Sequence, residues 1–207
     1  MDKKDYLKDI SEIKDIMNRS TRFMSLSGIS GILAGIYALA GGFAAYYLLL
    51  DYGKTTYGSS VLPLSILELI LIGIAITVAF LSIFTAYLFT KKKAKKNNEK
   101  IWTSASKQLM SSFMIPMLAG GLFTLLLVYR GYYGLVAPIT LIFYGLALIN
   151  ASKYTLSMIK YLGVVELVLG LLAMVFFGNG ILFWMLGFGV LHIIYGTLIY
   201  FKFDKAS

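Results

Sequence analysis

Six apolar runs of about bilayer-crossing length, separated by short polar or glycine-containing segments, constrain the fold of this 207-residue chain most strongly. A helix needs roughly 20 apolar residues to cross the hydrocarbon core of a membrane. Charged residues make up only 14% of the chain, whereas a soluble domain carries about a quarter. The sequence therefore predicts an all-α polytopic membrane protein. Its bundle of six transmembrane helices is expected at about 23–49, 61–89, 109–129, 132–150, 158–177 and 181–201.

An amphipathic helix is predicted within residues 1–22, ahead of the first span. Apolar side chains recur at helical spacing from Tyr6 to Met17, and charged side chains occupy the other face. One interpretation is a helix that lies on the inner leaflet. The other is a helix that covers the cytoplasmic end of the bundle or mediates a homo-oligomer, and the sequence leaves both open.

The distribution of Lys and Arg predicts the orientation in the membrane. Residues 1–22 contain six, the loop at 90–108 seven, residues 151–160 two and the C-terminal tail at 202–207 two, which makes seventeen. The other side has only Lys54 and Arg130. Because cytoplasmic loops carry the excess of Lys and Arg, both termini and the 90–108 loop are expected in the cytoplasm.

The basic run in the 90–108 loop is a candidate contact for anionic lipids. Nucleic acid is a poor alternative partner, because the sequence predicts no soluble domain that could present the basic patch. The simpler interpretation, that the positive charge only orients the chain in the membrane, also stays open. The candidate lipid contacts are Lys91, Lys92, Lys93, Lys95 and Lys96.

Small residues indicate how the helices pack. Gly28, Gly31 and Gly35 form one stripe on the first span, and Gly31 and Gly35 have the GxxxG spacing that permits close backbone contact. Gly163 and Gly170 in the fifth span repeat the seven-residue spacing of Gly28 and Gly35. The echo suggests a duplication, although glycine-rich packing alone also explains it.

Ionisable side chains inside the spans are the candidate functional residues. Glu166 and His192 lie at similar depths on the fifth and sixth spans, which Gly178-Asn179-Gly180 joins as an antiparallel hairpin. Ionisable groups at such depth are costly and commonly mark ion or proton pathways. Glu68 on the second span and Tyr144 on the fourth extend this candidate pathway. The alternative interpretation is that Glu166 and His192 form a purely structural hydrogen bond between helices, worth about 0.6–2 kcal/mol.

Catalytic and metal motifs do not accompany these residues. The chain has no cysteine and a single histidine, and it lacks HExxH, GxSxG, GxGxxG and P-loop motifs, so no metal or cofactor is expected. Gly28-Ile29-Ser30-Gly31 resembles the GxSG motif of rhomboid intramembrane proteases. Its serine, however, lies on the first span near the inner face, whereas rhomboids carry it on the fourth span toward the outside. The sequence therefore does not favour an enzyme.

Two stretches, Met17–Gly31 and Ala137–Thr155, resemble an uncharacterised family of small bacterial six-span membrane proteins. With the final hairpin, the resemblance covers most of the chain. It implies a free-standing protein of the bacterial cytoplasmic (inner) membrane, and it brings no activity and no site residues.

Two classes of function remain. The leading prediction is a channel or coupled transporter for a small solute or ion that uses the Glu166–His192 pair. The alternative is a non-transporting sensor, regulatory or assembly module that acts through the amphipathic arm and the basic loop. Transport predicts polar side chains from several helices that converge, whereas a module predicts pairs that are satisfied locally.

Overall fold

The computed structural model describes residues 22–55, 64–98 and 100–205, so residues 1–21, 56–63, 99 and 206–207 lie outside it. The predicted amphipathic helix therefore falls almost entirely outside the described residues. Every regular element within them is helical, which confirms the all-α prediction. Six segments are long and apolar enough to cross a membrane: Gly28–Asp51, Ile66–Lys96, Ser104–Tyr129, Tyr133–Tyr154, Met158–Val175 and Gly180–Asp204.

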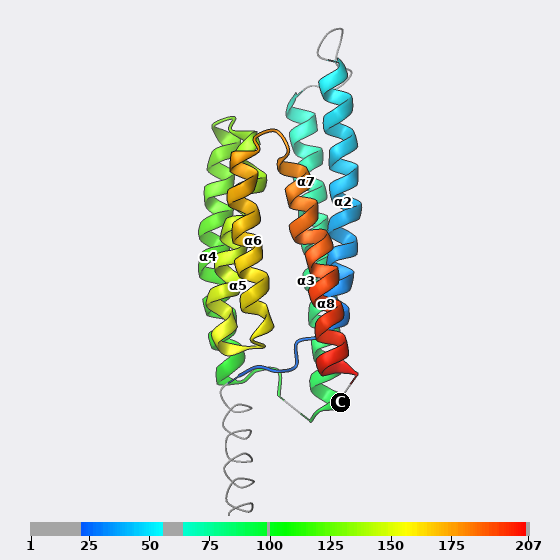
Figure 1. Ribbon diagram of the computed structural model, residues 1–207, viewed down its shortest axis with the longest axis vertical. Helices are drawn as coiled ribbons and strands as arrows, with labels where there is room; N and C mark the ends of the chain where they lie inside the picture. The colour runs from blue at the N-terminus through cyan, green and yellow to red at the C-terminus, as the bar shows by residue number, and fades with distance from the viewer. Residues whose placement is uncertain (1–21, 56–63, 99, 206–207) are drawn as a thin grey trace, which may run out of the picture.

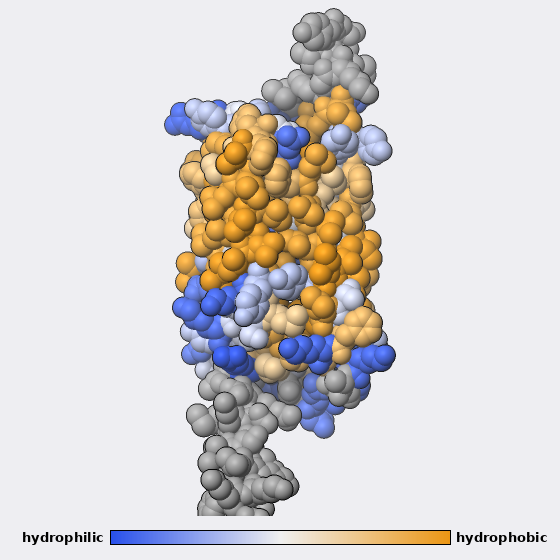
Figure 2. Space-filling model, in the orientation of Figure 1, coloured by the Kyte–Doolittle hydropathy of each residue, from blue (hydrophilic) through white to orange (hydrophobic). Residues whose placement is uncertain are grey.

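The surface agrees with a membrane-embedded bundle. Figure 2 shows an apolar band around the middle of the visible face, with polar residues at both ends. One end carries Lys91–Lys96, Lys153 and Lys202, and we call it the basic end. Many large apolar side chains are exposed on the surface of the bundle, as expected of helices that face lipid.

The helices form two groups that stand side by side (Figure 1). In the α2 group, α2 packs against both α3 and the last span. In the α5 group, α5 packs against both α4 and α6. The elements are α2 (Gly28–Thr55), α3 (Leu64–Lys96), α4 (Ser104–Tyr129), η1 (Tyr133–Leu135), α5 (Val136–Ala151), η2 (Ser152–Tyr154) and α6 (Met158–Val175), and the last span comprises α7 (Gly180–Trp184), η3 (Met185–Leu191), α8 (His192–Ile199) and η4 (Tyr200–Asp204).

Glycines allow the closest helix contacts within each group. A Cβ atom at Gly28 would lie 2.3 Å from the backbone nitrogen of Tyr200, and one at Gly35 would lie 2.6 Å from the carbonyl oxygen of Gly189. A Cβ at Gly31 would lie 3.1 Å from the Cα of Gly196. The stripe on α2 therefore faces the last span. Because backbones can approach this closely only where side chains are absent, these positions hold α2 against the last span.

The fifth span uses its glycines against a different neighbour. A Cβ at Gly163 would lie 2.8 Å from the carbonyl oxygen of Gly145, and one at Gly170 would lie 2.9 Å from that of Pro138. Both contacts are with α5. The two similar glycine spacings thus serve one contact in each helix group, α2 with the last span and α6 with α5.

Several element boundaries differ from the prediction. The first helix begins at Gly28, because residues 23–27 are extended. The predicted basic loop is shorter, since α3 continues to Lys96 and Thr103 caps α4 by accepting a hydrogen bond from the backbone N–H of Ser106 (3.1 Å). The predicted C-terminal tail is helical as far as Asp204.

The last span is not a uniform α-helix. The segments η3 and η4 are π-helical, one before His192 and one ending at Asp204. A π-helical turn changes which side chains share a face, and such turns are frequent at functional sites.

Candidate functional site

Three of the four predicted polar residues meet at the interface between the two helix groups. Glu166 comes from α6 and Tyr144 from α5, both in the α5 group, whereas His192 comes from α8 in the α2 group. His192 Nδ1 lies 3.5 Å from Glu166 Oε1, and the Tyr144 hydroxyl lies 2.7 Å from His192 Nε2. We call these three residues the triad.

The hydrogen bonds of His192 define its tautomer. Its Nδ1 lies 3.0 Å from the carbonyl oxygen of Gly187, five residues earlier in η3. Because a carbonyl oxygen can only accept, Nδ1 carries the hydrogen. In the neutral ring Nε2 then has a lone pair, which accepts the hydrogen bond that the Tyr144 hydroxyl donates. Both ring nitrogens are therefore satisfied without Glu166.

Glu166 is the residue of the triad that lacks a good partner. Its side chain is 0% exposed, and neither carboxyl oxygen has a hydrogen-bond partner among the described residues. His192 Nδ1 lies 3.5 Å from Glu166 Oε1 and already donates to the carbonyl oxygen of Gly187. Buried polar groups are nearly always hydrogen-bonded, so this carboxyl group calls for a functional explanation.

Gly187 makes room for the carboxyl group. A Cβ atom at this position would lie only 2.4 Å from Glu166 Oε2 and 2.6 Å from Leu141 Cδ2. Gly187 also supplies the carbonyl oxygen that holds His192. One residue of η3 therefore positions both the acid and the imidazole. Gly187 could not be identified from the sequence, because Gly187 and Gly189 both lie in the five residues before Leu191 and nothing in the sequence says which of them faces Glu166.

An aromatic shell packs around Tyr144 and His192. The Phe188 ring centroid lies 4.8 Å from that of Tyr144 and 6.0 Å from that of His192. Trp184 packs on Phe188 at 5.0 Å, and Phe113 meets Tyr144 edge-on at 6.0 Å. This shell lowers the local dielectric constant, which strengthens hydrogen bonds within the triad and raises the cost of an unpaired charge.

Glu68 does not join the triad. Its Oε1 accepts a hydrogen bond from the hydroxyl group of Tyr133, at the end of the bundle opposite the basic end. Glu68 belongs to α3 and Tyr133 to η1, so this bond also connects the two helix groups. Glu68 therefore lies apart from the triad, and its predicted place in the pathway stays a prediction.

Lys93 differs from the other candidate lipid contacts. Lys91, Lys92, Lys95 and Lys96 are exposed, whereas the Lys93 side chain is 11% exposed and its Nζ lies 2.7 Å from Asp204 Oδ1. Lipid contact by Lys93 stays a prediction, and in this structure its side chain faces the protein. The helical continuation of α3 explains it, since one side chain in each turn must face the bundle.

Among the residues that the structure describes, no three His, Asp or Glu side chains lie close enough together to hold a metal ion. No known protein family, curated protein or solved structure matches this chain. The function therefore has to be argued from the geometry of the triad.

Replacing Tyr144 with phenylalanine is expected to lower the free energy of unfolding by about 1–3 kcal/mol, because a buried ring nitrogen of His192 loses its hydrogen-bond donor. SDS titration of the purified protein in mild detergent measures this change. Tyr129→Phe is the matched control, since Tyr129 is 83% exposed. Equal stability of the two variants would contradict the role assigned to the Tyr144 hydroxyl.

Proposed function

We propose that this protein is a channel or coupled transporter for a small solute or ion, in which Glu166 binds and releases a proton at the interface between the two helix groups. The basic end faces the cytoplasm in this proposal, in keeping with the distribution of Lys and Arg. The observation that carries the proposal is the fully buried carboxyl group of Glu166, whose oxygens have no hydrogen-bond partner among the described residues.

If Glu166 and His192 served only to hold the helices together, they would be expected to form a hydrogen bond with each other. Here His192 forms hydrogen bonds with Tyr144 and with the carbonyl oxygen of Gly187, and the carboxyl group of Glu166 takes part in neither. A neutral carboxylic acid tolerates such a site far better than a carboxylate, whose burial without a partner is very costly. The arrangement therefore suits a group that is protonated in this conformation and loses its proton in another.

Loss of the proton would change the hydrogen bond of His192. The Nδ1–H group of His192 donates to the carbonyl oxygen of Gly187 at 3.0 Å. Glu166 Oε1 lies 3.5 Å from the same Nδ1 atom. A charged carboxylate is a stronger acceptor than a neutral carbonyl oxygen. The ionised Glu166 would therefore draw Nδ1–H away from Gly187, and His192 stays neutral throughout.

This exchange acts between the two helix groups. Glu166 belongs to the α5 group, whereas His192 and Gly187 belong to the α2 group. Proton binding thus alters the attraction between the groups at the centre of their interface. A ligand shifts a conformational equilibrium only through its different affinity for the two states, and the proton meets that condition here.

Proton flux into proteoliposomes tests the proposal. A pH-sensitive dye is enclosed, a potassium gradient with valinomycin sets the membrane potential, and separate batches contain Na⁺, K⁺, amino acids or sugars as candidate coupled solutes. We expect wild-type flux in at least one batch. In Glu166→Gln and His192→Ala that flux is expected to fall to the level of protein-free liposomes, because the proton site or its hydrogen-bond donor is lost.

Glu68→Gln is the matched comparison, since it makes the same chemical change at a carboxyl group that Tyr133 already binds. The amide oxygen of Gln can still accept the Tyr133 hydrogen, so most of the flux is expected to remain. Wild-type flux in a folded Glu166→Gln variant would refute the proposal. Absence of flux in every wild-type batch would favour a non-transporting module.

A further inference from the structure

An extended segment crosses between the two helix groups at the basic end. Residues 22–27, which we call the strap, run from beneath the α5 group to the start of α2 (Figure 1). Its buried side chains alternate, with Phe23 at 7%, Ser25 at 0% and Ser27 at 6% exposure. Alternation of this kind is typical of extended backbone. The strap is therefore packed into the protein rather than laid over its surface.

The α5 group holds the first part of the strap. The backbone N–H of Phe23 donates to the carbonyl oxygen of Tyr154 at 2.7 Å, and the hydroxyl of Thr155 donates to the carbonyl oxygen of Phe23 at 2.8 Å. Both backbone groups of Phe23 are thereby satisfied in a buried position, as buried backbone requires.

The α2 group holds the other part through one ion pair. Lys93 Nζ contacts Asp204 Oδ1 at 2.7 Å and also donates to the carbonyl oxygen of Leu26 at 3.0 Å. Asp204 Oδ2 accepts hydrogen bonds from the backbone N–H of Gly28 at 2.8 Å and from the Ser27 hydroxyl at 3.2 Å. The C-terminal end of the last span thus caps the N-terminus of α2, where a negative charge is favourable.

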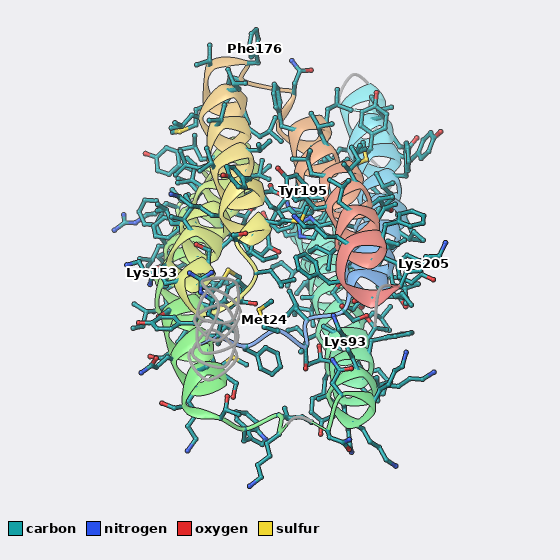
Figure 3. The ribbon with its side chains drawn as sticks, turned by 60° about the horizontal axis from the view of Figure 1, so that its bottom comes forward. Met24, Lys93, Lys153, Phe176, Tyr195 and Lys205 are labelled. Carbon is teal, nitrogen blue, oxygen red and sulfur yellow. The ribbon has the colours of Figure 1, made fainter. Side chains whose placement is uncertain are left out.

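Apolar side chains fill the space between the strap and the triad. Met24 and Leu26 pack against a cluster to which α5, α6 and α8 all contribute. Figure 3 shows Met24 between the two helix groups and Lys93 on the α2 group. The buried members of the cluster are Leu148, Leu156, Ile159, Leu162 and Ile199. Leu162 lies one turn of α6 from Glu166 toward the basic end, so the cluster and the strap close that side of the triad.

We propose that the strap is the inner gate of the site and that the Lys93–Asp204 ion pair is the latch that keeps it closed. Loss of either charge leaves the other poorly paired and frees the carbonyl oxygen of Leu26 or the N-terminus of α2. The strap then detaches from the α2 group while its bonds to Tyr154 and Thr155 persist. The gating role rests on the function proposed above, but the latch can be tested without any transport.

Chemical labelling of the protein in lipid nanodiscs tests this gate. Ser25→Cys reports the strap through its rate of reaction with a membrane-impermeant maleimide, and the chain has no other cysteine. Native Glu166 reports the triad through its modification by a water-soluble carbodiimide, read by mass spectrometry with Glu166→Gln as blank. We expect Lys93→Gln and Asp204→Asn to raise both rates about tenfold, the factor that loss of one or two net hydrogen bonds produces.

Two controls separate release of the strap from other effects. Lys92→Gln removes the neighbouring exposed charge and is expected to leave both rates unchanged. Ala173→Cys, at a position that is 1% exposed near the opposite end of α6, is expected to stay unreactive in the latch variants. Labelling of Ala173→Cys together with Ser25→Cys would mean general unfolding and would overturn the proposal.

Two further results would also overturn it. Slow labelling of Ser25→Cys in both latch variants would show that the ion pair does not hold the strap. A labelled strap with an unreactive Glu166 would show that the strap does not close the triad. Absence of flux in the wild-type protein would instead remove the proposed transport function and leave the labelling result valid.

Discussion

Gly187→Ala is expected to abolish the proton flux and to leave the fold intact. The added Cβ atom would lie 2.4 Å from Glu166 Oε2 and 2.6 Å from Leu141 Cδ2, and both atoms are the ends of side chains that can rotate. The carboxyl group is therefore displaced from His192 while the helices keep their positions. The free energy of unfolding is expected to stay within about 1 kcal/mol of wild type, since alanine also favours the helix.

The measurement combines flux in proteoliposomes with SDS titration in detergent. Gly73→Ala is the control, because a Cβ atom there meets nothing within 4 Å. Full flux in the Gly187→Ala variant would show that contact between Glu166 and the η3 backbone is not needed for the activity. Loss of both flux and stability would instead assign Gly187 a role in packing only.

Gly196→Ala, the same substitution two turns further along the last span, is expected to have the opposite consequence. Its Cβ atom would lie 2.6 Å from the backbone nitrogen of Ile32, 2.8 Å from the carbonyl oxygen of Gly28 and 2.9 Å from the carbonyl carbon of Gly31. Backbone atoms of a helix cannot rotate away, so α2 and α8 must move apart. We expect the free energy of unfolding to fall by about 2–3 kcal/mol.

SDS titration against Gly73→Ala measures this loss. The control is expected to match wild type or to gain up to about 1 kcal/mol, because glycine in an open helical position is unfavourable. A Gly196→Ala variant as stable as the control would mean that the close contact between α2 and the last span contributes nothing. The comparison of three Gly→Ala variants therefore distinguishes a glycine that serves the site, one that serves the fold and one that serves neither.

The triad depends on how the two helix groups lie against each other. Glu166 and Tyr144 are held within one helix group, and His192 and Gly187 come from the other. Polar connections between the groups within the described residues include the Glu68–Tyr133 bond, the triad itself, and the strap with its latch. Any relative movement of the groups must change at least one of them, which ties the proposed proton site to the proposed gate.

Much of the fold was predictable from the sequence because the membrane limits the options. An apolar run of roughly 20 residues in lipid must be helical, since every backbone group needs an internal hydrogen bond. Six such runs therefore predict six helices without any tertiary information. The hairpin at Gly178-Asn179-Gly180 likewise places Glu166 and His192 on consecutive spans at similar depth.

The sequence could not predict which faces of the helices meet. The rotation of each helix depends on its neighbours, and the π-helical segments η3 and η4 alter it within the last span. The contacts of Gly187, Tyr133 and Asp204 with the other helices depend on this rotation. For the same reason the sequence could not show that Lys93, one of the five lysines between positions 91 and 96, pairs with Asp204, 111 positions away.

Six apolar helices with polar groups at a shared depth follow from the amino-acid sequence alone, because hydrophobic length and backbone hydrogen bonding are local properties. The tertiary structure was needed to show that the last span lies with α2 and α3, that Tyr144 rather than Glu68 contacts His192, and that residues 22–27 contact both helix groups. Those outcomes depend on contacts between residues far apart in the chain, where a few ångströms of backbone approach, permitted by glycine, select one arrangement over the others.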